Sequence, residues 1–151
     1  MACVRFAVPM VFPARGRAGK AGALVAETLV RETVTLVGVA ERAAVARIFV
    51  GTLLAGHPGR DVAALLASEL FGNGVRHSRS GAPGGTVTVA VVAGDGLVRV
   101  EVTDQGGMGV PKVRRADHDE EGGRGLELVA ALATQWGWLR DGGQTVTWFD
   151  L

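Results

Sequence analysis

The sequence predicts an α+β fold, a two-layer sandwich in which a mixed, mostly antiparallel sheet is covered on one face by three helices. Short segments of alternating β-branched and polar residues are typical of strands, and longer segments with helical apolar spacing are typical of helices. The segments follow the order β-α-α-β-β-loop-α-β, which lacks the regular alternation of a doubly wound parallel sheet. The turn Gly94-Asp95-Gly96 joins two strands, which predicts an antiparallel hairpin.

The first half of the domain begins with a strand and continues with two helices. Thr33–Val37 alternates β-branched and apolar residues, which favours a strand. Glu41–Leu54 has apolar residues at helical spacing, and Gly56-His57-Pro58-Gly59 ends this helix. Asp61–His77 carries a second apolar side and is expected to form the next helix, followed by a loop over Ser80–Gly85.

The predicted hairpin pairs Thr86–Val92 with Leu97–Thr103. In the second of these strands Arg99 and Glu101 alternate with valines, so one face of the sheet is expected to be packed and the other hydrated. The next stretch, Asp104–Gly123, is rich in glycine and charge, and a loop of this length in a compact domain is usually functional or mobile.

The last part of the chain predicts a third helix over Gly125–Trp136 and a final strand over Thr145–Phe149, with a further strand at Trp136–Arg140 left open. The turn Asp141-Gly142-Gly143 precedes the final strand. The tryptophans alternate with apolar residues and are expected in the core; they are Trp136, Trp138 and Trp148.

Residues 1–31 are expected to form a flexible N-terminal extension, and residues 32–151 the folded domain. The extension is rich in proline, glycine, alanine and basic residues, although Ala21–Arg31 has some potential for a short helix. A length of 151 residues suits one domain.

Composition limits the classes of function. The net charge of +1 gives no electrostatic reason to expect direct nucleic-acid binding. Cys3 is the only cysteine, so no internal disulfide forms, which suits a reducing cytoplasm. No uncharged apolar run approaches the length needed to cross a bilayer, so we expect no membrane partner.

One side of the second predicted helix carries Glu69, Asn73 and His77 at spacings of four residues. Carboxylate and amide oxygens suit a hard cation, and a carboxylate can also take a proton. Gly72 and Gly74 flank Asn73, and glycine weakens a helix by about 1 kcal/mol relative to alanine. Either a ligand approaches this backbone closely or the helix packs tightly on the sheet.

Two glycine-rich segments adjoin predicted strand and helix ends. Asp104 opens the run Asp104-Gln105-Gly106-Gly107-Met108-Gly109, where a carboxylate can accept from an amine such as that of adenine. Gly122-Gly123-Arg124-Gly125 leads into the third helix, whose N-terminal amides can bind phosphate. The alternative is an ordinary Asp-led turn and an ordinary flexible helix start.

Taken in order, these segments resemble the motifs of the GHKL (histidine-kinase-like) ATPase superfamily. Glu69–Ser78 resembles its N box, Asp104–Gly107 its first glycine box and Gly123–Val129 its second, while Gln144–Trp148 resembles its closing strand. The short chain and the Arg-His-Ser end of the N box resemble the anti-sigma-factor serine/threonine kinases of the SpoIIAB/RsbW type found in actinomycetes. The resemblance covers residues 33–151 and implies a Bergerat-type ATP-binding fold.

The resemblance also implies roles for individual residues. Asn73 would hold Mg²⁺ at the ATP phosphates, and Glu69 would be the general base. Asp104 would bind the adenine amino group, supported by Gly106 and Thr145. Phosphates would lie under a lid formed by residues 110–122, held by Gly123, Arg124 and Gly125. His77, Gly107, Gly109 and Leu126 complete the implied nucleotide-binding set.

The implied function is an ATP-binding anti-sigma-factor regulator that phosphorylates a serine or threonine of a STAS-domain anti-anti-sigma protein and also binds a sigma factor. A homodimer formed near Thr33–Val37 is implied as well. Met108 stands where the first glycine box usually has glycine, and Asp117–Glu121 is acidic. These two features favour the alternative of an ATP-binding module without phosphate transfer. A third possibility is a relative that has lost the nucleotide.

Overall fold

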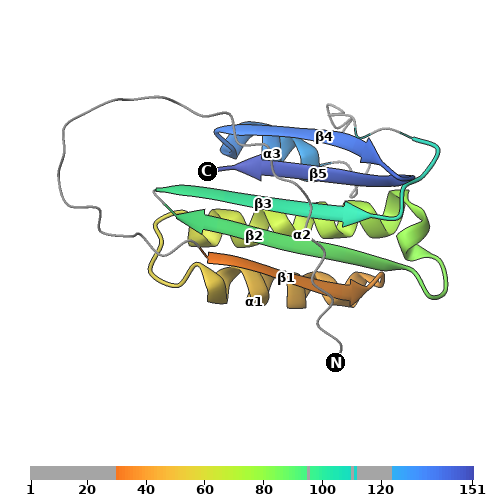
Figure 1. The fold of residues 1–151 in the computed structure, drawn as a ribbon, viewed down its shortest axis with the longest axis horizontal. Helices are drawn as coiled ribbons and strands as arrows, with labels where there is room; N and C mark the ends of the chain where they lie inside the picture. The colour runs from red at the N-terminus through yellow and green to blue at the C-terminus, as the bar shows by residue number, and fades with distance from the viewer. Residues whose placement is uncertain (1–29, 95, 110, 112–123) are drawn as a thin grey trace.

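The computed structural model describes residues 30–94, 96–109, 111 and 124–151, and its strands form one sheet with helices packed against one face (Figure 1). The helices are η1 (Ala40–Arg42), α1 (Ala43–Leu53), α2 (Arg60–His77), η2 (Arg79–Gly81) and α3 (Gly125–Leu132). The strands are β1 (Val30–Val37), β2 (Thr86–Gly94), β3 (Leu97–Asp104), β4 (Gln135–Asp141) and β5 (Gln144–Asp150).

The strand order in the sheet is β1-β2-β3-β5-β4, and every pair is antiparallel. The predicted α+β sandwich is confirmed, with three α-helices on one face among the described residues. No pair of these strands is parallel, so the sheet is more regular than the mixed sheet that the sequence predicts. The predicted hairpin is β2–β3, in which Val89 pairs with Val102 and Val91 with Val100.

The core lies between the sheet and the helices because side chains alternate between the two faces of a strand. β2 and β3 each place a row of fully buried or nearly buried valines on the helix side, and α2 covers them with large apolar side chains. The principal members are Val87, Val89, Val91, Val98, Val100, Val102, Leu66, Leu70, Phe71 and Phe149. This packing fixes α2 over the centre of the sheet.

The other face of the sheet, here called the open face, carries polar and charged side chains. Arg99 donates two hydrogen bonds of 2.6 Å to the carboxylate of Asp150. The Arg99 guanidinium also lies 4.4 Å from the ring centre of Trp148. The predicted alternation of Arg99 and Glu101 with buried valines is therefore present, but the polar face contains a compact ion pair rather than only hydrated side chains.

The structure corrects several predicted boundaries. β1 begins at Val30 because residues 30–32 continue the pairing with β2, so the short helix predicted over Ala21–Arg31 does not include its last two residues. Most of the predicted extension, residues 1–29, lies outside the described residues. η1 replaces the first residues of the helix predicted at Glu41.

The third helix was predicted to run to Trp136, and this is wrong. Its last residue is Leu132, and Ala133 is extended with ψ 145°. The chain then pairs with β5 as the edge strand β4, where Thr134 N–H donates to Asp150 C=O at 2.8 Å. Gly137 pairs with Trp148, and a Cβ on Gly137 would lie 2.8 Å from the Trp148 ring. The strand at Trp136–Arg140 that the sequence left open therefore exists.

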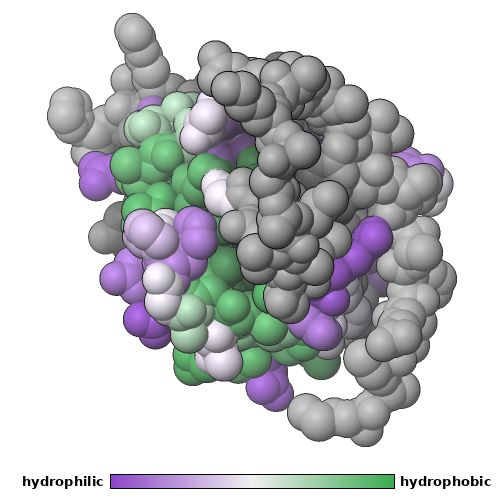
Figure 2. Space-filling model, turned by 60° about the vertical axis from the view of Figure 1, so that its left-hand side comes forward, coloured by the Kyte–Doolittle hydropathy of each residue, from purple (hydrophilic) through white to green (hydrophobic). Residues whose placement is uncertain are grey.

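The prediction that all three tryptophans lie in the core is also wrong. Trp136 packs against the core, but Trp138 on the edge strand is 37% exposed and Trp148 lies on the open face. Other large apolar side chains are exposed as well, among them Ile48 of α1 and Met108. Figure 2 shows hydrophobic and hydrophilic residues side by side on the part of one face that is not grey. No helix among the described residues combines the length and the apolar character needed to cross a membrane.

Candidate functional site

α2 brings Glu69 and Asn73 together, as the helical spacing predicts. Both side chains are half-buried, and α2 is continuous from Arg60 to His77, so residues four apart share one side. His77 is the last residue of α2 and is exposed. The His77 carbonyl oxygen is close to the loop that follows β3, because a Cβ on Gly107 would lie 2.6 Å from this oxygen. His77 is therefore at the opposite end of the stripe from Glu69.

The first residue of α3 packs directly against this pair. A Cβ on Gly125 would lie 2.9 Å from Asn73 Nδ2 and 3.2 Å from Glu69 Oε2. Arg124, the N-cap residue, is exposed and provides no side-chain cap, while Leu126 is buried in the core. The amides of the first turn of α3 lie next to Asn73, and a helix N-terminus can bind an anion there. Gly123 and the predicted lid at 110–122, except Pro111, lie outside the described residues.

Asp104 ends β3 on the helix-covered face, directly across from Thr145 at the start of β5. The Thr145 side chain is buried. A Cβ on Gly74 would lie 3.2 Å from Asp104 Cβ, so this glycine lets α2 approach the strand end. The sequence leaves two explanations for the glycines of this helix. At Gly74 the structure shows the second, close packing of the helix on the sheet. Through it, Asp104 lies beside the residue that follows Asn73.

The Asp104 carboxylate is held in a partly desolvated position. Burial raises its pKa above the usual range for an aspartate. Opposing this, Gly106 N–H donates to Asp104 Oδ1 at 2.7 Å, Ser78 adds a side-chain hydrogen bond, and nearby arginines attract the charge. A carboxylate fixed in this way can accept a hydrogen bond from an amino group of a bound ligand.

The loop Gln105–Gly109 after Asp104 is clamped from two sides. Arg79 N–H donates to Gly106 C=O at 2.9 Å, and Arg140 Nη2 donates to the carbonyls of Gly107 and Gly109. Gly106 has φ +68°, and a Cβ there would overlap the carbonyl oxygen of Gly143. Gly106 and Gly107 are therefore needed for close packing, whereas Met108 and Gly109 are exposed.

Ser80 is a site-supporting residue that the sequence reasoning missed. It is fully buried; its Oγ donates to Thr86 C=O at 2.6 Å and accepts from Gln105 N–H at 2.9 Å. This hydroxyl connects η2, the start of β2 and the loop after Asp104. The only local signal was the Ser78-Arg79-Ser80-Gly81 sequence, which is typical of a turn with side-chain-to-backbone hydrogen bonds. The clamping roles of Arg79 and Arg140 had no signal in the sequence.

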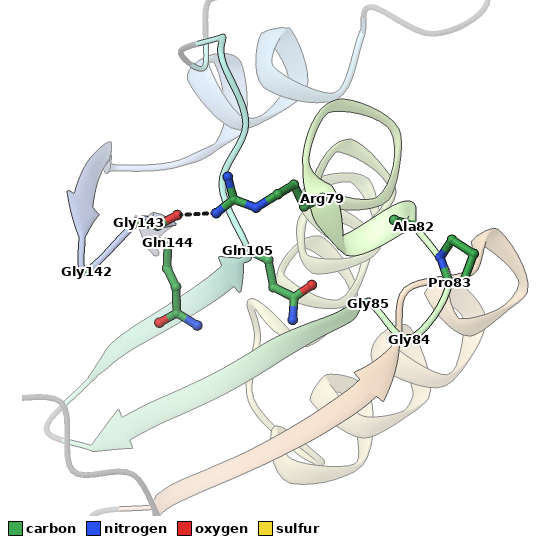
Figure 3. A pocket seen from close by; sticks show the side chains of 9 residues that line it. All are labelled: Arg79, Ala82, Pro83, Gly84, Gly85, Gln105, Gly142, Gly143 and Gln144. Atoms are coloured by element: carbon green, nitrogen blue, oxygen red, sulfur yellow. Dashed lines mark hydrogen bonds between the residues drawn. The ribbon is translucent and has the colours of Figure 1, made fainter.

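A separate hollow of about 440 Å³ lies at the end of the sheet and contains none of the predicted site residues (Figure 3). Gln105 and Gln144 line it, one position beyond the facing pair Asp104 and Thr145, so strand alternation directs their side chains to the opposite face. Arg79 crosses its rim and donates from Nη2 to Gly143 C=O at 3.1 Å (Figure 3). Of the Gln105–Gly109 loop, only Gln105 lines this hollow.

The assembled site has two chemically different ends joined by α2. At one end the Asp104 carboxylate and Thr145 can accept hydrogen bonds. At the other end Asn73 and Glu69 offer hard oxygens beside the N-terminal amides of α3. The described residues hold no cluster of three or more His, Cys, Asp or Glu side chains that would bind a metal alone. A hard divalent cation fits at Asn73 when the anionic ligand and water complete its shell.

Comparisons with known proteins identify the family and support the fold. The model of the family described as the histidine kinase-like ATPase domain matches residues 30–150. The crystal structure of the RsbU and RsbW domains of Rv1364c from Mycobacterium tuberculosis superposes with a TM-score of 0.59 at 23% sequence identity. The match covers 80% of this chain but only 31% of that one, so the likeness shows the fold. The comparison with curated proteins gave no match.

Proposed function

The chain belongs to the histidine kinase-like ATPase domain family, and from that premise we propose that it is an ATP-binding regulator of the anti-sigma-factor type. The observation that carries the proposal is the arrangement along α2. A Cβ on Gly74 would lie 3.2 Å from Asp104 Cβ, while the side chain of the preceding residue, Asn73, lies where a Cβ on Gly125 at the start of α3 would approach it to 2.9 Å. A ligand with amino donors at one end and phosphates at the other spans such a site.

In the proposed complex Asp104 accepts from the adenine amino group, with Gly106, Gly107, Gly109 and Thr145 shaping that end. The amides at the start of α3, with Gly123, Arg124, Gly125 and Leu126, bind the phosphates, and His77 lies at the end of α2 beside the loop. Asn73 Oδ1 holds Mg²⁺. When bound, Mg²⁺ neutralises phosphate charge.

We propose further that the chain is a serine/threonine kinase in which Glu69 is the general base. Its carboxylate lies at the start of α3, beside the proposed phosphate position, where it can take the proton of an attacking serine hydroxyl. Phosphoryl transfer depends mainly on positioning and charge neutralisation, so few residues suffice. The resemblance to anti-sigma-factor kinases supports a STAS-domain anti-anti-sigma protein as substrate, a sigma factor as second partner, a homodimer and a cytoplasmic location.

Transfer of labelled phosphate from ATP to the STAS partner, compared between wild type and Glu69→Gln, tests the kinase assignment. The variant keeps the size of the side chain and removes its basicity, so we expect retained ATP affinity and at least a hundredfold slower transfer. Asp104→Asn is the matched variant at the other end and should lose affinity instead. Equal transfer rates in Glu69→Gln and wild type would exclude Glu69 as the base.

The second candidate is an ATP-binding module that binds its partners without transferring phosphate. Met108 favours it, because this side chain is fully exposed at 103% of its reference area at a position where the resembling family usually has glycine. Under this alternative, wild type binds ATP and the partner, but labelled phosphate stays in the nucleotide.

A further inference from the structure

Arg76 makes a contact that the proposed function does not use. Its Nη2 donates to Asn73 Oδ1 at 2.9 Å, so a guanidinium sits on the amide oxygen that we assign to the metal. The two residues are three apart on α2, a spacing at which helix side chains meet. The guanidinium has room because residue 72, one turn earlier on α2, is glycine. A Cβ at that position would lie only 3.2 Å from Arg76 Nη1.

We propose that Arg76 and the metal compete for Asn73 Oδ1, so that Arg76 occupies this oxygen in the nucleotide-free protein and leaves it when the metal binds. The inference rests on the proposed function. The competition explains why residue 72 is glycine, because glycine disfavours the helix by about 1 kcal/mol relative to alanine.

Charge makes the two occupants exclusive. An amide oxygen has two lone pairs and could in principle accept from both. A guanidinium bonded at 2.9 Å to the same oxygen as a divalent cation would, however, place like charges only a few ångströms apart, where they repel even at a surface. Arg76 is exposed, so its release needs no rearrangement of the core.

The measurable consequence is the factor by which Mg²⁺ increases nucleotide affinity. In wild type the metal must first displace a charge-assisted hydrogen bond. Without Arg76 this opposing contact is absent. We therefore expect Arg76→Gln to increase the Mg²⁺ factor by about two- to fivefold, the range expected for an exposed side-chain pair with one charged member.

The experiment titrates the full chain with a fluorescent ATP analogue, once with Mg²⁺ and once with EDTA. Arg47→Gln is the matched control, because Arg47 is an exposed arginine on the neighbouring helix α1. Gly72→Ala keeps the charge of Arg76 but crowds its guanidinium, so it should change the factor in the same direction by a smaller amount. An unchanged factor in Arg76→Gln, or an equal change in Arg47→Gln, overturns the inference.

A second readout follows the side chain itself. In ¹⁵N-labelled wild type, the Arg76 Nε–H resonance should shift on adding Mg²⁺ with the nucleotide and shift less with the nucleotide in EDTA. Equal shifts in the two conditions contradict the competition. Nucleotide that binds with an unaltered Mg²⁺ factor refutes the role of Arg76 alone, whereas absence of nucleotide binding in all variants refutes the proposed function and this inference with it.

Discussion

At the scale of single residues, the site depends on one carboxylate, Asp104, whose burial disfavours its charge. Asp104 is placed at the end of β3 by strand alternation and is desolvated by α2, whose close approach is possible because residue 74 is glycine. Its raised pKa is the mark of that conflict. A carboxylate in such a position is kept at a cost in stability, which is typical of binding sites rather than of structural ion pairs.

We predict that Asp104→Asn stabilises the fold but weakens nucleotide binding. The pKa of Asp104 is higher in the folded than in the unfolded chain, so its contribution to stability is complete below about pH 4 and is lost as the pH rises through the folded pKa. Asp104→Asn should therefore gain stability relative to wild type between about pH 4 and pH 7, measured by thermal unfolding at several pH values. A gain that grows as the pH falls would contradict the assignment.

Ser80 supports the same loop without touching the proposed ligand. We predict that Ser80→Ala lowers the free energy of unfolding by about 1–3 kcal/mol, because Gln105 N–H and Thr86 C=O lose their buried partner. Urea denaturation measures the loss. Ser68→Ala is a suitable control, since Ser68 Oγ donates to Leu65 C=O within its own helix and its loss should change stability much less.

At the scale of elements, the sequence was most informative where local pattern and tertiary contacts agree. The β2–β3 hairpin and α2 were predictable because apolar spacing, glycine turns and burial all indicate the same structure. The end of α3 was not, because residues 133–136 can continue a helix and become a strand only by pairing with β5. The room that Gly137 leaves for Trp148 is a cross-strand contact that no local pattern shows.

The candidate site was predictable to a similar degree. Glu69, Asn73 and Asp104 have recognisable chemistry at recognisable positions, whereas Arg79, Arg140 and Ser80 act on backbone groups that only the fold brings near. A hydrogen bond from an arginine to a loop carbonyl depends on the tertiary fold, so no regular residue spacing in the sequence predicts it.

Within α2, Gly72 is predicted to limit helix stability. Gly72→Ala should raise the free energy of unfolding by about 0.5–1 kcal/mol, because alanine loses less backbone entropy and its Cβ meets only the far end of the flexible Arg76 side chain. Thermal unfolding of the full chain checks this. A lower midpoint temperature would show that the Arg76 side chain does not move aside for the added Cβ, although it is exposed.

At the scale of the whole molecule, the two faces of the sheet are specialised. The helix-covered face holds the core and the candidate site, while the open face holds the Arg99–Asp150 ion pair that joins β3 to β5. Because these two strands also carry Asp104 and Thr145, the ion pair helps to fix the register of the site from the opposite side of the sheet.

We predict that Asp150→Ala destabilises the fold by about 3 kcal/mol, because it removes the carboxylate that accepts two hydrogen bonds from Arg99, whose side chain is only 11% exposed. The double variant Arg99→Met with Asp150→Leu should regain most of that loss, since it removes both charges. Chemical denaturation of both proteins measures the difference. A double variant as unstable as the single one would mean that the loss comes from the missing pair itself and not from the buried charge that the single variant retains at Arg99.

We propose that the Asp104 end and the Asn73–Gly125 end form one ATP site. Calorimetric titration of the full chain with ATP, with and without Mg²⁺, tests this most directly. We predict saturable binding with one ATP per chain, stronger with Mg²⁺ and abolished or greatly weakened in Asp104→Asn while that variant remains folded. Absence of saturable binding at millimolar ATP by a folded wild-type chain would show that the two ends do not form an ATP site.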